Sequence, residues 1–188
     1  WQGENFDCLF SKIYDCALNN GIIELSGSLA GVSRQPFMRY NMNISVFADG
    51  KIEYNLNGNI RESVVWLPRL GFEFSMKNSS RAFSYYGSGP YESYRDMCHA
   101  STVGLYESDA DKEYVNYVMP QEHGNHTSSK MLKIGNMKFE CENTFDFSVS
   151  NYDSKMLTKA THTDDLQKTD KTYVRIDYKN SGLGSNSC

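Results

Sequence analysis

The chain has 188 residues and a net charge of −4, with acidic and basic side chains interspersed along its length. This length can bury a substantial core, and we expect one domain rather than two. The lack of a basic stripe argues against a nucleic-acid partner, whereas a neutral ligand fits this charge. No run of about eighteen apolar residues is present, so the sequence predicts no membrane span.

The ends of the sequence and its cysteines suggest where the chain comes from. It begins at Trp1 and ends at Cys188, inside a run rich in Gly, Ser and Asn, and we interpret both ends as cut from a larger polypeptide.

The cysteines are odd in number, scattered and without CxxC spacing: Cys8, Cys16, Cys98, Cys141 and Cys188. This pattern is typical of reduced thiols rather than of a disulfide framework or a zinc site. We therefore expect a cytoplasmic protein.

In chain order, the first clear elements form a hairpin. Residues 6–10 and 22–29 are weak strand candidates. Residues 37–48 alternate apolar and polar side chains, and the alternation resumes at Ile52 after the pair Asp49-Gly50. Because such a pair can take the positive φ angles of a tight primed turn, the pattern predicts a hairpin over residues 37–58.

The later part of the chain repeats the two-residue period. Further strands are predicted at residues 70–76, 83–85, 137–141, 145–149 and 174–178. Asp153 or Ser154 can cap one short helix that runs through Ala160. The interval 87–135 lacks strict alternation, and we expect a long loop there. About ten short strands and an aromatic content of 13% predict an all-β, largely antiparallel sandwich with one short helix.

Two acidic residues could carry hydrolytic chemistry. Cleavage of a glycosidic bond needs two carboxyl groups that flank it, about 5 Å apart in a retaining enzyme, and Glu92 and Glu122 could be nominated. However, Gly-x-Gly-Pro followed by Tyr, Glu92 and Arg95 also describes a rigid loop held by a bidentate arginine–carboxylate pair. We favour this structural interpretation and predict no catalytic residue in the chain.

The histidines show no metal-binding pattern. None has HxH or HExxH spacing, and Gly124-Asn125 between His123 and His126 favours a turn over a helix. We predict that they are ordinary surface residues and that the chain holds no metal. The four are His99, His123, His126 and His162.

Three motifs stand in order along the chain. They read Leu-Pro-Arg-Leu-Gly at residues 67–71, Gly-Ser-Gly-Pro-Tyr-Glu-Ser-Tyr-Arg-Asp at 87–96 and Tyr-Val-Met-Pro-Gln-Glu-His-Gly at 117–124. A Gly-Leu-Gly loop follows at 182–184. In order and spacing, this set resembles the carboxy-terminal domain of family 2 β-galactosidases. The resemblance covers about residues 66–188 well and the first third only in its strand pattern.

The resemblance implies a galactose mutarotase-like β-supersandwich at the end of a retaining multi-domain enzyme. The catalytic glutamates would lie on a central TIM barrel outside this chain, as would sites for Mg²⁺ and Na⁺. Asn186 and Cys188 would line the substrate pocket, where a relative can place a stacking tryptophan. Glu92, Arg95 and Glu122 would be structural. The implied partners are the upstream domains, a galactoside substrate and further copies of the full enzyme in a bacterial cytoplasm, with neither nucleic acid nor membrane.

Two hypotheses follow. The first is a non-catalytic domain that shapes the active-site pocket and binds carbohydrate, and sequence alone does not separate it from a purely structural module. The second is a stand-alone protein, either a carbohydrate-binding module or an aldose 1-epimerase. Epimerisation needs an acid and a base across the anomeric centre, for which His99, His123 and Glu122 are the candidates.

Overall fold

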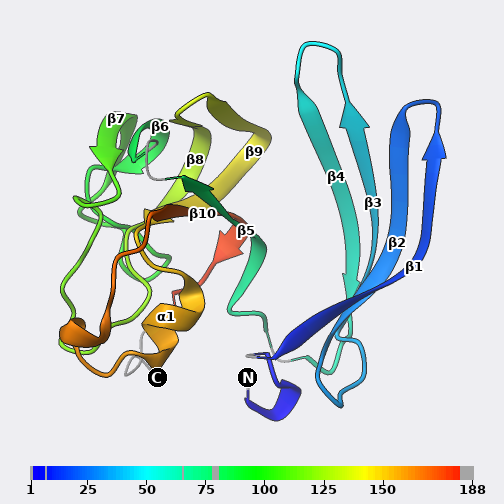
Figure 1. Ribbon diagram of the computed structural model, residues 1–188, viewed down its shortest axis with the longest axis horizontal. Helices are drawn as coiled ribbons and strands as arrows, with labels where there is room; N and C mark the ends of the chain where they lie inside the picture. Colours follow the sequence, from blue (N-terminus) through cyan, green and yellow to red (C-terminus); the bar gives the residue numbers. More distant parts are fainter. Residues whose placement is uncertain (1, 7, 65, 78–80, 183–188) are drawn as a thin grey trace. The chain divides into compact units, whose positions relative to one another are not determined.

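The computed structural model describes residues 2–6, 8–64, 66–77 and 81–182. The chain divides into two compact units, unit 1 over Trp1–Trp66 and unit 2 over Leu67–Cys188. Each unit contains one antiparallel sheet, and α1 (Ser154–Lys159) is the one α-helix of the described residues (Figure 1). The all-β prediction with one short helix is therefore confirmed. That the two units form the single domain expected from the sequence stays a prediction.

Unit 1 is a four-stranded meander. Its strands follow the chain in the order β1-β2-β3-β4, and each pairs with the next. The predicted hairpin is confirmed, because Ile44 pairs with Tyr54 across β3 and β4. The strands are β1 (Leu9–Asn19), β2 (Ile22–Gly31), β3 (Met38–Val46) and β4 (Ile52–Ile60).

The turns of unit 1 correct one prediction. Phe47 N–H donates to Lys51 O at 2.9 Å, so three residues close the β3–β4 hairpin, and of these Gly50 has a positive φ of 88°. The expected two-residue primed turn is wrong there. Asn20 and Gly21, between β1 and β2, have the two positive φ angles that such a turn requires. The Asn-Gly pair was the signal for it in the sequence.

Unit 2 contains a six-stranded sheet in the order β5-β10-β9-β8-β6-β7. Two of its strands, β7 and β8, lie within the interval 87–135, so the expectation of one long loop is wrong. The stretches predicted at 137–141 and 145–149 form one strand. The strands are β5 (Arg69–Lys77), β6 (Ala82–Gly89), β7 (Thr102–Asp109), β8 (Asn125–Ile134), β9 (Met137–Ser150) and β10 (Lys171–Asn180).

The two faces of this sheet differ in chemistry. One face carries the hydrophobic core, in which Phe147, Val149 and Val174 are fully buried together with Tyr85 and Leu132. The alternate positions of β9 and β10 are polar but also buried: Asp146, Ser148, Ser150, Arg175 and Asp177. Buried polar groups require hydrogen-bond partners, so this polar face can exist only if other segments supply them. The candidate site is built on it.

Helix α1 begins where the sequence predicts. The Asp153 carboxylate accepts a hydrogen bond from Met156 N–H at 2.7 Å, which satisfies one of the free donors of the first turn. We expect Asp153→Ala to lower the free energy of unfolding of unit 2 by about 1 kcal/mol. Urea denaturation followed by circular dichroism measures this loss. The exposed Asp170, changed to alanine in the same way, is the control and should change stability by less than about 0.5 kcal/mol.

Candidate functional site

The first and third motifs meet through Arg69 on the polar face of unit 2. Its Nε donates to Asp177 Oδ1 at 3.4 Å and its Nη2 to Asp177 Oδ2, while Nη1 lies 3.4 Å from Glu122 Oε1. Asn180, which pairs in register with Arg69, donates its side-chain amide to the same Glu122 oxygen. We refer to Arg69, Glu122, Asp177 and Asn180 as the Arg69 cluster.

The Arg69 cluster is largely removed from water. The side chains of Asp177, Glu122 and Arg69 are 1%, 8% and 21% exposed. Burial raises the pKa of Asp177 to about 6, and the nearby Arg69 guanidinium only partly offsets this effect. Burial acts to lower the pKa of Arg69, but the charges of Glu122 and Asp177 outweigh it and hold that pKa above its ordinary value.

Gly71 explains why the first motif ends in glycine. A Cβ atom placed there would lie 2.6 Å from Asp177 Cα and would also overlap the Asp177 carboxylate and the Ile176 carbonyl. These are largely backbone neighbours, which cannot move aside cheaply. The motif therefore supplies both the cation, Arg69, and the glycine that lets β10 approach closely enough for Asp177 to reach that cation.

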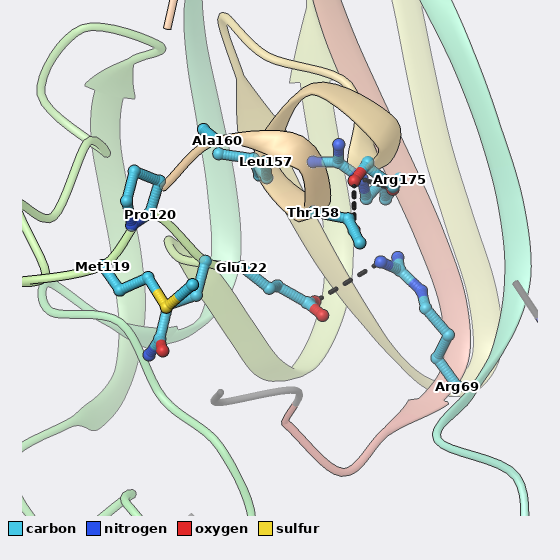
Figure 2. Close-up of a pocket in the computed structure, with 10 residues that line it drawn as sticks. Arg69, Met119, Pro120, Glu122, Leu157, Thr158, Ala160 and Arg175 are labelled. Carbon is cyan, nitrogen blue, oxygen red and sulfur yellow. Dashed lines mark hydrogen bonds and ion pairs between the residues drawn. The ribbon is translucent and has the colours of Figure 1, made fainter. Parts of the chain in front are cut away.

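Glu122 also lines a hollow of about 260 Å³ beside α1 (Figure 2). Its apolar wall is formed by Met119, Pro120, Leu157 and Ala160, and its charged part by Arg69, Glu122 and Arg175. Figure 2 shows the Glu122 carboxylate directed toward the Arg69 guanidinium. Arg175 is itself fully held: its Nε donates to Glu73 Oε2 at 2.7 Å and its Nη2 to Tyr152 O at 2.9 Å.

The second motif is attached to the third through Glu92. One Glu92 oxygen accepts from Gly124 N–H at 2.8 Å and the other from the Tyr117 hydroxyl. Gly124 has a φ of +66°, a conformation that favours glycine. Ser93 and Asn125 exchange a second pair of bonds, from Ser93 N–H to Asn125 O at 2.6 Å and from Asn125 Nδ2 to Ser93 O at 2.8 Å. The motifs thus form one connected network.

This network holds the start of the Gly-rich loop. Ser181 N–H and its hydroxyl both donate to Pro68 O, at 3.1 and 2.6 Å. Gly182 N–H donates to Asn180 Oδ1 at 2.9 Å, and Gly182 lies against the Tyr94 ring. Pro68 of the first motif and Tyr94 of the second therefore contact Ser181 and Gly182 directly, and Glu122 of the third acts through Asn180. Asn186 and Cys188, the predicted pocket residues, lie outside the described residues.

The nominated carboxyl pair is not brought together in the hollow beside α1. Glu122 lines that hollow, whereas Glu92 lines neither it nor a second hollow of unit 2. The predicted Glu92–Arg95 pair does not form either, because Glu92 bonds Tyr117 and Gly124 instead. Arg95 lies exposed at the second hollow. The partners of Glu92 and Glu122 are those of structural groups.

The histidines divide into two classes. His99 and His162 are exposed, as predicted, but His123 and His126 are buried, so the surface prediction is wrong for them. His126 Nε2 lies 2.8 Å from Glu113 Oε2, and its ring stacks on Phe147. Burial lowers the pKa of His123, whose Nδ1 lies 2.9 Å from Gln121 O. A clear alternation of apolar and polar residues could have predicted that both histidines are buried, but residues 117–126 show no such alternation.

The described residues contain no candidate metal site and no candidate membrane-spanning helix. Within the described ranges, no group of three or more His, Cys, Asp or Glu side chains is placed to hold a metal ion. Among the cysteines that the structure describes, Cys16, Cys98 and Cys141 are free thiols. No described helix has the length and apolar character needed to cross a bilayer.

Comparisons with known proteins agree with the motifs. A family model described as "Beta galactosidase small chain" matches residues 14–188. A β-galactosidase of Actinobacillus pleuropneumoniae is 31% identical over 192 residues, which cover 100% of this chain and 19% of that protein. β-Galactosidases of Vibrio cholerae and Kluyveromyces lactis are 30% and 31% identical, over 98% and 100% of this chain. The chain thus spans about a fifth of the length of these relatives.

Proposed function

Because this chain belongs to the β-galactosidase small chain family, we propose that it acts as a non-catalytic domain of a retaining β-galactosidase. The full enzyme would hydrolyse terminal β-D-galactosides such as lactose, with its catalytic glutamates on other domains. One observation carries this proposal: the three motifs converge, directly or through Asn180, on Ser181 and Gly182 rather than on a cavity lined by two carboxyl groups. Their geometry suits the task of holding a loop in place.

The loop that they hold is the proposed point of contact with substrate. Asn186 and Cys188 would help to wall the active-site pocket and bind the sugar. A thiol has no aromatic face, so Cys188 would not supply the stacking energy that a tryptophan gives against a sugar ring. This difference would affect the preference for the aglycone more than the recognition of galactose.

The other partners follow from the same proposal. The upstream domains of the same polypeptide would contact this chain, and the full enzyme would form a homo-oligomer in the bacterial cytoplasm. Any Mg²⁺ or Na⁺ that the full enzyme uses would bind elsewhere. The epimerase alternative gains no support, because His123 is buried, Glu122 is bonded to Arg69 and Asn180, and His99 is exposed apart from them.

Release of nitrophenol from a chromogenic β-galactoside tests the proposal. We expect the 188-residue chain to be inert at high concentration and the polypeptide extended upstream through its barrel to be active. Turnover by the chain alone that is lost in Glu92→Gln or Glu122→Gln would overturn it. As a test of the loop, Asn186→Ala in the extended enzyme should raise KM, whereas the exposed control Asp170→Ala should leave KM unchanged.

A further inference from the structure

A second hollow of unit 2 has a different composition from the one beside α1. Its volume is about 370 Å³, and most of the residues that line it are polar or charged, with Tyr94 and Cys98 as the exceptions. The remaining lining residues come from β6, β8, β9, β10 and the loop after β6: Ser88, Thr127, Ser128, Asp146, Lys179 and Arg95. Residues nearly a hundred positions apart in the sequence are thus brought to one cavity.

The side chains of this hollow offer four donor groups that the protein does not use. Over the described ranges, neither the Arg95 guanidinium nor the Lys179 ammonium forms an ion pair or a side-chain hydrogen bond. The hydroxyls of Ser88 and Ser128 likewise have no hydrogen-bond partner among those residues. The two arginines buried on the polar face, Arg69 and Arg175, are by contrast engaged in ion pairs. What distinguishes this hollow is that its four free donors line one cavity.

The carboxylate of the hollow and its Thr127 hydroxyl, in contrast, are engaged. Asp146 is buried, and its two oxygens accept from Ser128 N–H at 3.2 Å and Asn180 N–H at 3.0 Å. The Thr127 hydroxyl is bonded to the Ser93 hydroxyl at 2.9 Å. Arg95 and Lys179 contribute two positive charges to the lining and Asp146 one negative charge, so the lining carries one net positive charge. A ligand that only accepts hydrogen bonds and carries negative charge complements this arrangement.

We propose that this hollow binds an oxyanion of the phosphate type, as free phosphate or as a phosphate ester. Oxygens of such an anion accept hydrogen bonds from guanidinium, ammonium and hydroxyl donors at once, and bonds between charged groups are about twice as strong as neutral ones. A neutral sugar could bond the Ser88 and Ser128 hydroxyls, which accept as well as donate, but it fits less well because it would leave the two cations of the lining without a counter-charge. The site does not depend on the proposed galactosidase role.

Isothermal titration of the 188-residue chain with inorganic phosphate, at fixed ionic strength, tests this site. We expect saturable binding of one phosphate per chain, with a Kd on the order of a millimolar. Arg95→Gln and Lys179→Gln should each weaken binding by about tenfold or more, the loss that corresponds to one charge-assisted hydrogen bond. Ser88→Ala should weaken it less. The matched control is Lys133→Gln, an exposed lysine on β8 of the same sheet, which should bind as the parent does.

Sulfate, a glycerol phosphate ester and galactose separate the remaining possibilities. Displacement of bound phosphate by sulfate or by the ester supports an oxyanion site. Displacement by the ester also shows that the hollow accepts a substituted phosphate. Binding of galactose in place of phosphate would overturn the proposal. Equal weakening by Lys133→Gln would also overturn it, because the attraction would then be a general effect of charge. Circular dichroism of each variant verifies the fold, and chromogenic-substrate turnover by the extended enzyme, measured separately, reports on the galactosidase proposal alone.

Discussion

Substitution of Arg69 by methionine is expected to destabilise unit 2 by about 3–5 kcal/mol at pH 7, because it leaves buried carboxylates without their counter-charge. Asp177 and Glu122 are 1% and 8% exposed, so water cannot replace the guanidinium. Methionine keeps much of the aliphatic stem, which confines the change to the charge and its hydrogen bonds. Hydrogen exchange of β9 and β10 amides measures the loss within unit 2 itself.

An arginine of similar exposure, but with an exposed carboxylate partner, provides the matched comparison. Arg81 pairs with Asp111 at 2.9 Å, but 28% and 44% of these side chains are exposed. Arg81→Met should therefore cost no more than about 1 kcal/mol, as is typical of surface ion pairs. Equal losses in the two variants would show that the Arg69 cluster gains nothing from its burial. Arg69→Lys, which keeps the charge but not the planar fork, should fall between the two.

A consequence for the Gly-rich loop follows from the same variant. Asn180 bonds both Glu122 and Gly182, so disturbance of the Arg69 cluster reaches the residue where the loop begins. In the extended enzyme, we therefore expect Arg69→Met to impair galactoside turnover beyond its effect on the amount of folded protein.

The local parts of the fold could be predicted from the sequence because their causes are local. The alternation around Ile44 and Tyr54 is sufficient to define a hairpin, and an Asp153 cap before a short helical stretch defines α1. The prediction was wrong at the turn after Val46, because Asp-Gly pairs serve three-residue as well as two-residue loops. It was also wrong over 87–135, where β7 contains Gly104 and alternates weakly.

The Arg69 cluster could not be assembled from the sequence, although the motifs pointed to two of its members. Arg69 and Asp177 are 108 positions apart, and β10 reads in the sequence as an ordinary half-exposed strand. Its polar positions are in fact buried, since loops and α1 supply their partners. Alternation tells which residues share a face, but not what covers that face. For the same reason His126 was taken for a surface residue although it is fully buried.

The titration of Asp177 gives a second large effect, with an unusual sign. Its pKa in the folded chain is raised to about 6, against an ordinary value of 3.8. Between these two values the folded chain binds more protons than the unfolded chain, so the contribution of Asp177 to stability is complete below about pH 4 and is lost as pH rises through about 6. The difference between the two pKa values, 3.8 and about 6, corresponds to a change of at most about 3 kcal/mol in the free energy of unfolding. Paired carboxylates usually show the opposite dependence.

A comparison with Asp177→Asn isolates this contribution from those of the other carboxylates. The free energy of unfolding of the parent minus that of Asp177→Asn should fall between pH 4 and pH 7. An equal fall for the exposed control Asp170→Asn would show that the effect does not come from the burial of Asp177. A difference that grows with pH would mean that the ion pair with Arg69, and not burial, controls Asp177. The same experiment bears on Arg69→Met: at pH 4.5 Asp177 is protonated and needs no counter-charge, so the cost of that substitution should be smaller than at pH 7.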